Sequence, residues 1–171
     1  GNPGKQYALN RHNIGFLVVD KLAEMHDVKF SRLQLNALVT DFRHDGKKII
    51  LAKPRTFMNA SGNAISSLAK FYKIPVEHIT LVFDDVDLDF DRIKLRPKGG
   101  SGGHKGVKST IERMGSDTFA RIRVGIGRPK GRMKTPAHVL QDFSKEEKEF
   151  LPPILDTAAK ASLAIIDDGI D

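Results

Sequence analysis

Arg11, His12 and Asn13 bring together a cation, an imidazole that titrates near neutral pH and an amide, directly before an apolar stretch of sequence. A turn precedes them, Gly1-Asn2-Pro3-Gly4, because proline fixes φ near about −65° and glycine tolerates positive φ. The amide of Asn2 and the imidazole of His12 could therefore face each other across a pocket. For one histidine alone, a solvated side chain at a helix start is the more common case, so the rest of the sequence has to decide.

Two further polar residues stand where elements are expected to meet. Asn59 follows Phe57 and Met58 at an expected strand-to-helix junction, where its amide either caps the helix or holds a substrate carbonyl. Asp84 directly follows the apolar run 79–83, which is typical of a buried central strand. Ligands bind at the carboxyl ends of strands in open α/β sheets, and a carboxylate there can orient a histidine and stabilise its imidazolium.

The acidic run after this strand also suggests a metal site. Asp85, Asp87 and Asp89 have the spacing that opens a calcium loop, but Phe90 stands where the loop needs glycine and Arg96 where it needs glutamate. A magnesium phosphodiesterase that uses Asp85 and Asp87 stays open as an alternative, although the sequence offers it no complete ligand set.

Residues 99–106, Gly-Gly-Ser-Gly-Gly-His-Lys-Gly, form a loop that is expected to lead into a helix. Its glycines allow backbone N–H groups to approach a phosphate, but it matches neither the Walker motif nor the dinucleotide-binding motif. With Lys98 and Lys105 beside it, the loop predicts either a clamp for a nucleic-acid phosphate or a mobile lid. His104 within this loop is weak evidence for a site by itself.

The composition is that of a globular protein, and its basic charge suggests a polyanionic partner, although many basic proteins bind no nucleic acid. The 171 residues carry a net charge of +7, and their basic residues gather around and after the glycine loop. The absence of cysteine excludes disulfides, thiol catalysis and cysteine-ligated zinc. No apolar run is long enough for a membrane span and no signal peptide is present, so we expect a cytoplasmic protein.

The hydrophobic periodicity predicts helices and strands that alternate along the chain. Helices are expected over 14–25, 59–72 and 105–114, and strands over 37–42, 48–52, 79–83, 92–96 and 119–126, with a hairpin turn at 44–46. Ser144 and Glu147 form a capping box before a C-terminal helix, which we expect to be broken or restarted at Pro152-Pro153. We therefore expect an α/β fold, a single domain over residues 1–171 with a twisted mixed β-sheet flanked by helices.

Five motifs, taken together, strongly resemble those of the bacterial-type peptidyl-tRNA hydrolases. In order they are Gly1-Asn2-Pro3-Gly4 with Tyr7 and Arg11-His12-Asn13-x-Gly15, Lys53-Pro54-x-Thr56-Phe57-Met58-Asn59-x-Ser61-Gly62, Asp84-Asp85-x-Asp87-Leu88, Gly102-Gly103-His104-x-Gly106 and Arg123-x-Gly125-Ile126-Gly127-Arg128-Pro129. The resemblance runs from Gly1 to Phe143 and continues weakly into the C-terminal helix. It implies the family's α/β fold, and it implies that a strand before Gly1 and a tail after Asp171 are missing from the sequence.

The resemblance implies an enzyme that cleaves the ester between a peptide and the 3′ ribose of tRNA, which recycles the tRNA for translation. By matching position, His12 is expected to be the general base that activates water, and Asp84 to orient His12 and stabilise its charged form. An imidazole suits this work at neutral pH. The resemblance implies no metal and no cofactor.

The same matching assigns the groups that hold the substrate. Asn2 and Asn59 are expected to hold the peptide and the terminal nucleotide, while Phe57 and Met58 shape the cleft and Tyr7 lies nearby. The expected partner is the acceptor stem and 3′ CCA end of peptidyl-tRNA, bound by a monomer.

Lys94, Arg96 and Arg123 match basic residues that contact tRNA, and phosphate contacts of this kind do not read base sequence. Lys105 stands where the family usually has asparagine. A cation there can contact a phosphate or stabilise an oxyanion, and it disfavours the charged form of a nearby histidine. A non-catalytic RNA-binding relative, like the organellar splicing factors that share this fold, is the main alternative.

Overall fold

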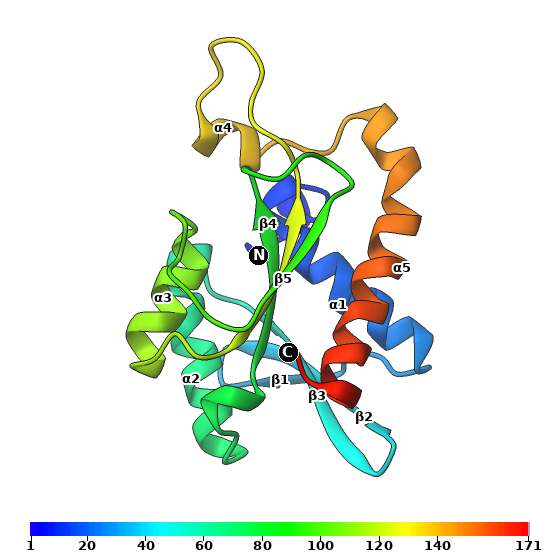
Figure 1. The fold of residues 1–171 in the computed structure, drawn as a ribbon, viewed down its shortest axis with the longest axis vertical. Coiled ribbons are helices and arrows are strands. Elements are labelled where there is room, and N and C mark those ends of the chain that lie inside the picture. Colours follow the sequence, from blue (N-terminus) through cyan, green and yellow to red (C-terminus); the bar gives the residue numbers. More distant parts are fainter. Residues whose placement is uncertain (171) are drawn as a thin grey trace.

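Figure 1 shows the computed structural model, which describes residues 1–170. The helices are α1 (Ile14–Met25), α2 (Ser61–Phe71), α3 (Lys105–Met114), α4 (Thr135–Val139) and α5 (Lys145–Asp168), and the strands are β1 (Arg32–Gln34), β2 (Ala37–His44), β3 (Lys47–Pro54), β4 (Thr80–Asp85), β5 (Ile93–Arg96) and β6 (Ala120–Gly125). Single 3-10 turns are η1 (Lys5–Tyr7), η2 (Arg11–Asn13), η3 (Met58–Ala60) and η4 (Val76–His78).

The strands form two three-stranded sheets instead of the single mixed sheet expected. The first is an antiparallel sheet in the order β1-β2-β3, and the second has the order β4-β6-β5, with β4 parallel and β5 antiparallel to β6. Helices α1 and α5 pack against each other on one side of β4, and α2 and α3 pair on the other (Figure 1). The α/β class and the single domain are confirmed.

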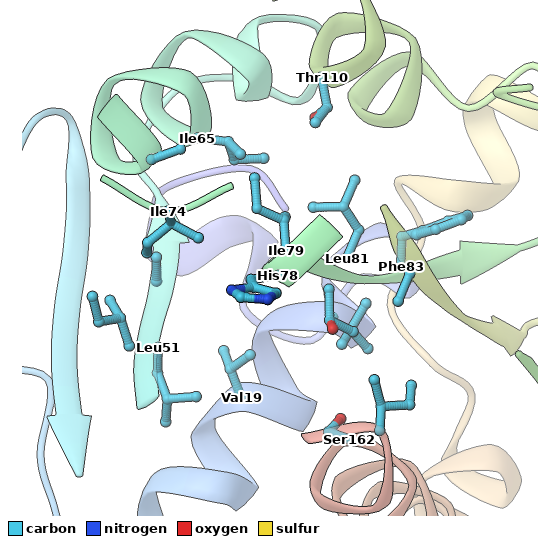
Figure 2. A pocket seen from close by; sticks show the side chains of 18 of the residues that line it. Val19, Leu51, Ile65, Ile74, His78, Ile79, Leu81, Phe83, Thr110 and Ser162 are labelled. Carbon is cyan, nitrogen blue, oxygen red and sulfur yellow. The ribbon is translucent and has the colours of Figure 1, made fainter. Parts of the chain in front are cut away.

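A cavity of about 1120 Å³ lies between β3 and β4, which are not paired with each other within the described residues. Figure 2 shows its apolar lining, with Val19 of α1 on one side, Ile65 of α2 on another, and Leu51 and Leu81 from the two strands. The run 79–83 forms a strand as expected, but not a buried central one. In the part of the chain that the structure describes, β4 pairs only with β6, and its apolar residues are half-buried. The strand expected before Gly1 and the tail expected after Asp171 lie outside the described residues.

Most of the expected elements are confirmed, and α3 spans the residues predicted for it. The C-terminal helix, however, is not broken: α5 continues through Pro152 and Pro153. Both prolines are exposed, while Leu151 and Ile154 on either side of them are buried in the core formed by α1, β6 and α5. Packing of both halves against one core therefore outweighs the two lost hydrogen-bond donors. The short elements β1 and α4 were not expected.

The first turn of α1 contacts the backbone of β4. A Cβ atom placed on Gly15 would lie 2.2 Å from the carbonyl oxygen of Val82, so only glycine allows this approach. Because Gly15 follows His12 by one helical turn and Val82 precedes Asp84 by two residues, this contact brings those two side chains to the same place.

Candidate active site

The carboxylate of Asp84 is hydrogen-bonded to two imidazoles. Its Oδ2 lies 2.7 Å from Nδ1 of His12, and its Oδ1 lies 2.8 Å from Nε2 of His104. Asp84 is near the carboxyl end of β4, His12 is in the turn before α1, and His104 directly precedes α3. The structure thus brings together the two residues expected as base and carboxylate, and it adds His104, to which the sequence alone assigned no role.

The hydrogen bonds around His104 determine which of its nitrogens carries the proton. Nδ1 accepts from the backbone N–H groups of Gly106 at 3.1 Å and Val107 at 3.3 Å, so it is unprotonated. The proton is then on Nε2, which donates to Asp84. Both nitrogens of His104 are therefore engaged, whereas Nε2 of His12 has no hydrogen-bond partner within residues 1–170.

Asp84 is a buried charge that its neighbours keep ionised. Its side chain is 2% exposed, against 12% for His12 and 9% for His104. Burial by itself would raise the pKa of the Asp84 carboxyl, but the imidazoles of His104 and His12 hold that pKa well below its ordinary value. An ionised Asp84 fixes the Nδ1 proton of His12 toward itself and directs Nε2 away from it.

Hydrogen bonds of Asn2 and Asn13 connect the N-terminal turn, residues 1–4, to the rest of the site. Oδ1 of Asn2 accepts from the backbone N–H of Met58 at 2.7 Å, and the backbone N–H of Asn2 donates to Oδ1 of Asn13 at 2.6 Å. The side chain of Asn13 returns a bond to the carbonyl of Asn2 at 2.9 Å. The side-chain nitrogen of Asn2 makes no hydrogen bond within residues 1–170.

The residues expected to shape the cleft have different environments. Tyr7 and Phe57 form an edge-to-face pair with ring centroids 6.5 Å apart, and Phe57 is 60% exposed. Met58 is buried against the first turn of α3, since a Cβ on Gly106 would lie 2.5 Å from its sulfur. Asn59 is exposed and does not cap α2, which begins at Ser61, so the interpretation of Asn59 as a helix cap is wrong.

The glycine loop leads into α3 as expected, but the start of this helix is not open to an anion. The imidazole of His104 already accepts from the N–H groups of Gly106 and Val107, which a phosphate would need. Lys105 is exposed on the first turn of α3, next to His104 in the sequence. A phosphate near this loop would therefore contact lysine side chains and not the backbone N–H groups at the start of the helix.

The three basic residues expected to contact tRNA share one face of the second sheet. Lys94 of β5 is paired with Arg123 of β6, and Arg96 lies two residues along the same strand. Lys94 and Arg96 are exposed, whereas Arg123 is half-buried and its Nε lies 2.5 Å from a carboxylate oxygen of Asp85. Two of the three cations are therefore open to a ligand, and the third is partly neutralised.

The two carboxylates on which the magnesium alternative depends are both paired with arginines in the structure. Asp85 is paired with Arg123, and Asp87 is paired with Arg128. Within residues 1–170, the groups with ligand atoms close enough to hold a metal are the cluster of His12, Asp84 and His104 and a second cluster of His44, Asp45 and Asp167. Asp85 and Asp87 belong to neither group.

The family model described as peptidyl-tRNA hydrolase matches residues 1–171. The chain belongs to this family. It is 44% identical over 171 residues to the peptidyl-tRNA hydrolase of Caldanaerobacter subterraneus subsp. tengcongensis. The matched residues make up 100% of this chain and 92% of that protein. The peptidyl-tRNA hydrolase of Desulforudis audaxviator is also 44% identical over 171 residues, which make up 86% of its length. The crystal structure of the peptidyl-tRNA hydrolase from Acinetobacter baumannii matches with a TM-score of 0.90 at 30% identity, over 98% of this chain and 85% of that chain.

The expected family and its enzyme class, with tRNA recycling in translation as the process it serves, are thus confirmed. The main residue that sequence reasoning missed is His104. Its signal was its place in Gly102-Gly103-His104, directly before a predicted helix, where an imidazole can cap the helix and still reach a strand end. No helix within residues 1–170 is both long enough and apolar enough to cross a membrane.

Proposed function

We propose that His12 is the general base with which the chain hydrolyses the ester between a peptide and the 3′ ribose of tRNA. Nε2 of His12 takes a proton from water as the water oxygen attacks the ester carbonyl carbon. When the tetrahedral intermediate collapses, the bond to the ribose oxygen breaks and that oxygen takes the proton back from the imidazolium. The observation that carries this role is the pairing of His12 Nδ1 with an ionised carboxylate, which leaves Nε2 unpartnered.

Asp84 stabilises the imidazolium that forms during the reaction and holds the ring in one tautomer. His104 does not act as a base in this proposal, because both of its nitrogens are engaged. It donates to the other oxygen of Asp84 and so fixes the rotation of the carboxylate. The two histidines therefore have different tasks around one carboxylate.

The substrate would be held on both sides of the base. The free amide nitrogen of Asn2 and the exposed amide of Asn59 are donors for the peptide and the terminal nucleotide, and the exposed ring of Phe57 beside Tyr7 offers a surface for stacking. Met58 forms the buried wall between them. Lys105 lies beside His104 and would contact a phosphate.

The phosphates of the tRNA would lie along the sheet face that carries Lys94, Arg96 and Arg123. This places the acceptor stem over β5 and β6 and the 3′ CCA end at Asp84, near the carboxyl end of β4. We propose that the chain acts as a monomer in the cytoplasm, where peptidyl-tRNA is produced. Contacts with phosphates alone suit an enzyme that accepts many tRNAs.

The test is hydrolysis of an N-blocked aminoacyl-tRNA by the unmodified chain and by His12→Ala, each with and without a chelator. We expect turnover that the chelator does not change and that falls by about 10²–10⁴-fold in the variant, because one positioned base contributes on that order. His44→Ala is the matched control. His44 also pairs with a carboxylate, but it lies at the end of β2 and its partner, Asp167, lies at the end of α5. Retained turnover in His12→Ala would exclude His12 as the base. Intact tRNA binding without hydrolysis by the unmodified chain would instead indicate a non-catalytic RNA-binding protein.

A further inference from the structure

A segment far along the chain holds the residues that precede His12. This segment, residues 138–147, is called the strap below; it runs from the end of α4 into the first turn of α5. The backbone N–H of Arg11 donates to the carbonyl of Gln141 at 3.0 Å, and the N–H of Phe143 donates to the carbonyl of Leu9 at 3.0 Å. Between them, the side chain of Asn10 donates to the carboxylate of Asp142 at 2.6 Å. The strap thus pairs with residues 9–11 like a short additional strand.

The side chain of Arg11 makes the strongest contacts with the strap. It is 8% exposed, and its Nη1 donates to the carbonyl of His138 at 3.2 Å and to Oε1 of Gln141 at 3.1 Å. Its Nη2 donates to Oε1 of Glu147 at 2.8 Å. The same glutamate oxygen accepts from the backbone N–H of Ser144 at 2.9 Å, in the capping box of α5.

Glu147 is ionised in this arrangement. Burial by itself would raise the pKa of its carboxyl, but the hydrogen bonds from Ser144 and Arg11 outweigh burial and lower that pKa. Arg11 and Glu147 are therefore a charged pair in which Arg11 is buried and Glu147 partly exposed, and loss of either partner would leave the other without its opposite charge. Even a substitution of Arg11 by another cation is expected to disturb the strap, because it removes several of these hydrogen bonds at once.

Arg11 and His12 are neighbours in the 3-10 turn η2, and their side chains are bonded to opposite parts of the molecule. Arg11 is bonded to the strap, whereas His12 is bonded to β4 through Asp84. The turn is held from both sides, so any shift of Arg11 moves the backbone that carries His12. Misplacement of a catalytic group by about 1 Å can lower a rate by about 10²-fold.

We infer that Arg11 is a positioning residue and that, through it, the strap sets the place of the His12 imidazole, although no residue of the strap belongs to the site. This inference rests on the proposed function of His12. Arg11 cannot at the same time bind tRNA, because its terminal nitrogens are buried and engaged. A change confined to residues 138–147 should therefore alter the chemical step and leave substrate binding unchanged.

The test compares Arg11→Lys and Glu147→Gln with Arg32→Lys, a matched control whose arginine also lies 2.8 Å from a carboxylate but on the exposed surface. We expect Arg11→Lys to lower kcat on N-blocked aminoacyl-tRNA at least tenfold, with KM changed less than twofold and the control unchanged. Glu147→Gln keeps the acceptor oxygen and should have a smaller effect. The double variant should lose little more than Arg11→Lys alone, because both changes break one unit.

A second measurement does not depend on activity. The proton on Nδ1 of His12, donated to Asp84, gives a downfield NMR signal that His12→Ala removes and so identifies. In Arg11→Lys this signal should shift or broaden, while the folded fraction measured by urea unfolding stays close to one at the assay temperature. An unchanged signal and an unchanged kcat in a folded Arg11→Lys chain would overturn the inference. If the unmodified chain showed no hydrolysis, the proposed function would fail, and the NMR signal alone would decide the role of Arg11.

Discussion

Two histidine–aspartate pairs in this molecule have the same bond length and different surroundings. His12 lies 2.7 Å from Asp84, and His44, at the β2–β3 turn, lies 2.7 Å from Asp167 at the end of α5. The first pair has side chains that are 12% and 2% exposed, and its carboxylate is bonded to a second imidazole. The second pair is 22% and 38% exposed, and Asp45 adds a second carboxylate at 3.8 Å from the same nitrogen of His44.

The difference shows that the same hydrogen bond between these two residue types occurs in two different electrostatic environments. Water and salt screen the charges of the exposed pair, so its two partners are free to separate. In the buried pair the effective dielectric constant is lower, and the carboxylate has no solvent to replace its imidazoles. Burial therefore makes one pair rigid and polarised, and exposure leaves the other a weak link between two surface elements.

The largest expected effect comes from Asp84→Asn. This change keeps the size of the side chain but removes the charge that fixes the His12 tautomer, so kcat should fall by about 10²–10⁴-fold in the hydrolysis assay. Asp167→Asn makes the same chemical change in the exposed pair and should leave kcat unchanged. Similar losses in both variants would show that burial does not separate the two pairs.

Acid should unfold the chain partly through Asp84. Because its pKa is lowered by folding, the carboxyl stabilises the folded state at pH values above its ordinary pKa of about 3.9, and this contribution is lost as the pH falls below that value. We expect a loss on the order of 2 kcal/mol in the free energy of unfolding between about pH 4 and pH 2. Urea unfolding measured across this range should show a shallower decline for Asp84→Asn than for the unmodified chain. Parallel curves would mean that the buried carboxylate is not ionised.

The smallest effect is expected for His44→Ala. The exposed pair should contribute about 0.5 kcal/mol or less to the free energy of unfolding, and this contribution should decrease further at high salt. Urea unfolding at low and high ionic strength measures both quantities. A loss comparable to that caused by Asp84→Asn would remove the distinction between buried and exposed pairs.

Local sequence patterns predicted the helices and strands better than they predicted how those elements pair and pack. Residues 105–114 were predicted as a helix because the glycine loop marks its start, and the helix has those bounds. The run 79–83 was predicted correctly as a strand, but its place at a sheet edge within residues 1–170 depends on which strands pair with it, and that is a long-range property. The break expected at Pro152-Pro153 ignored the core contacts of the residues around them.

The site, like the fold, was predicted only in part. The approach of His12 and Asp84 could be expected from their places before a helix and after a strand, together with the family motifs. The second imidazole on Asp84 was not predicted, because the place of His104 before a helix does not show which residue lies at its Nε2, and that residue is 20 positions earlier. Likewise, the contacts of Arg11 join residues more than 120 positions apart, beyond the reach of any spacing rule.

The contact between Gly15 and the carbonyl of Val82 fixes the approach of His12 to Asp84 through main-chain atoms. Side chains can change rotamer or be replaced, but the close approach of α1 to β4 at this point is made by main-chain atoms, which are present whatever side chains surround them. Residue 15 is the exception, since replacing one of its hydrogens by a methyl group would force the helix and the strand apart. Any residue larger than glycine at position 15 should therefore displace His12 relative to Asp84.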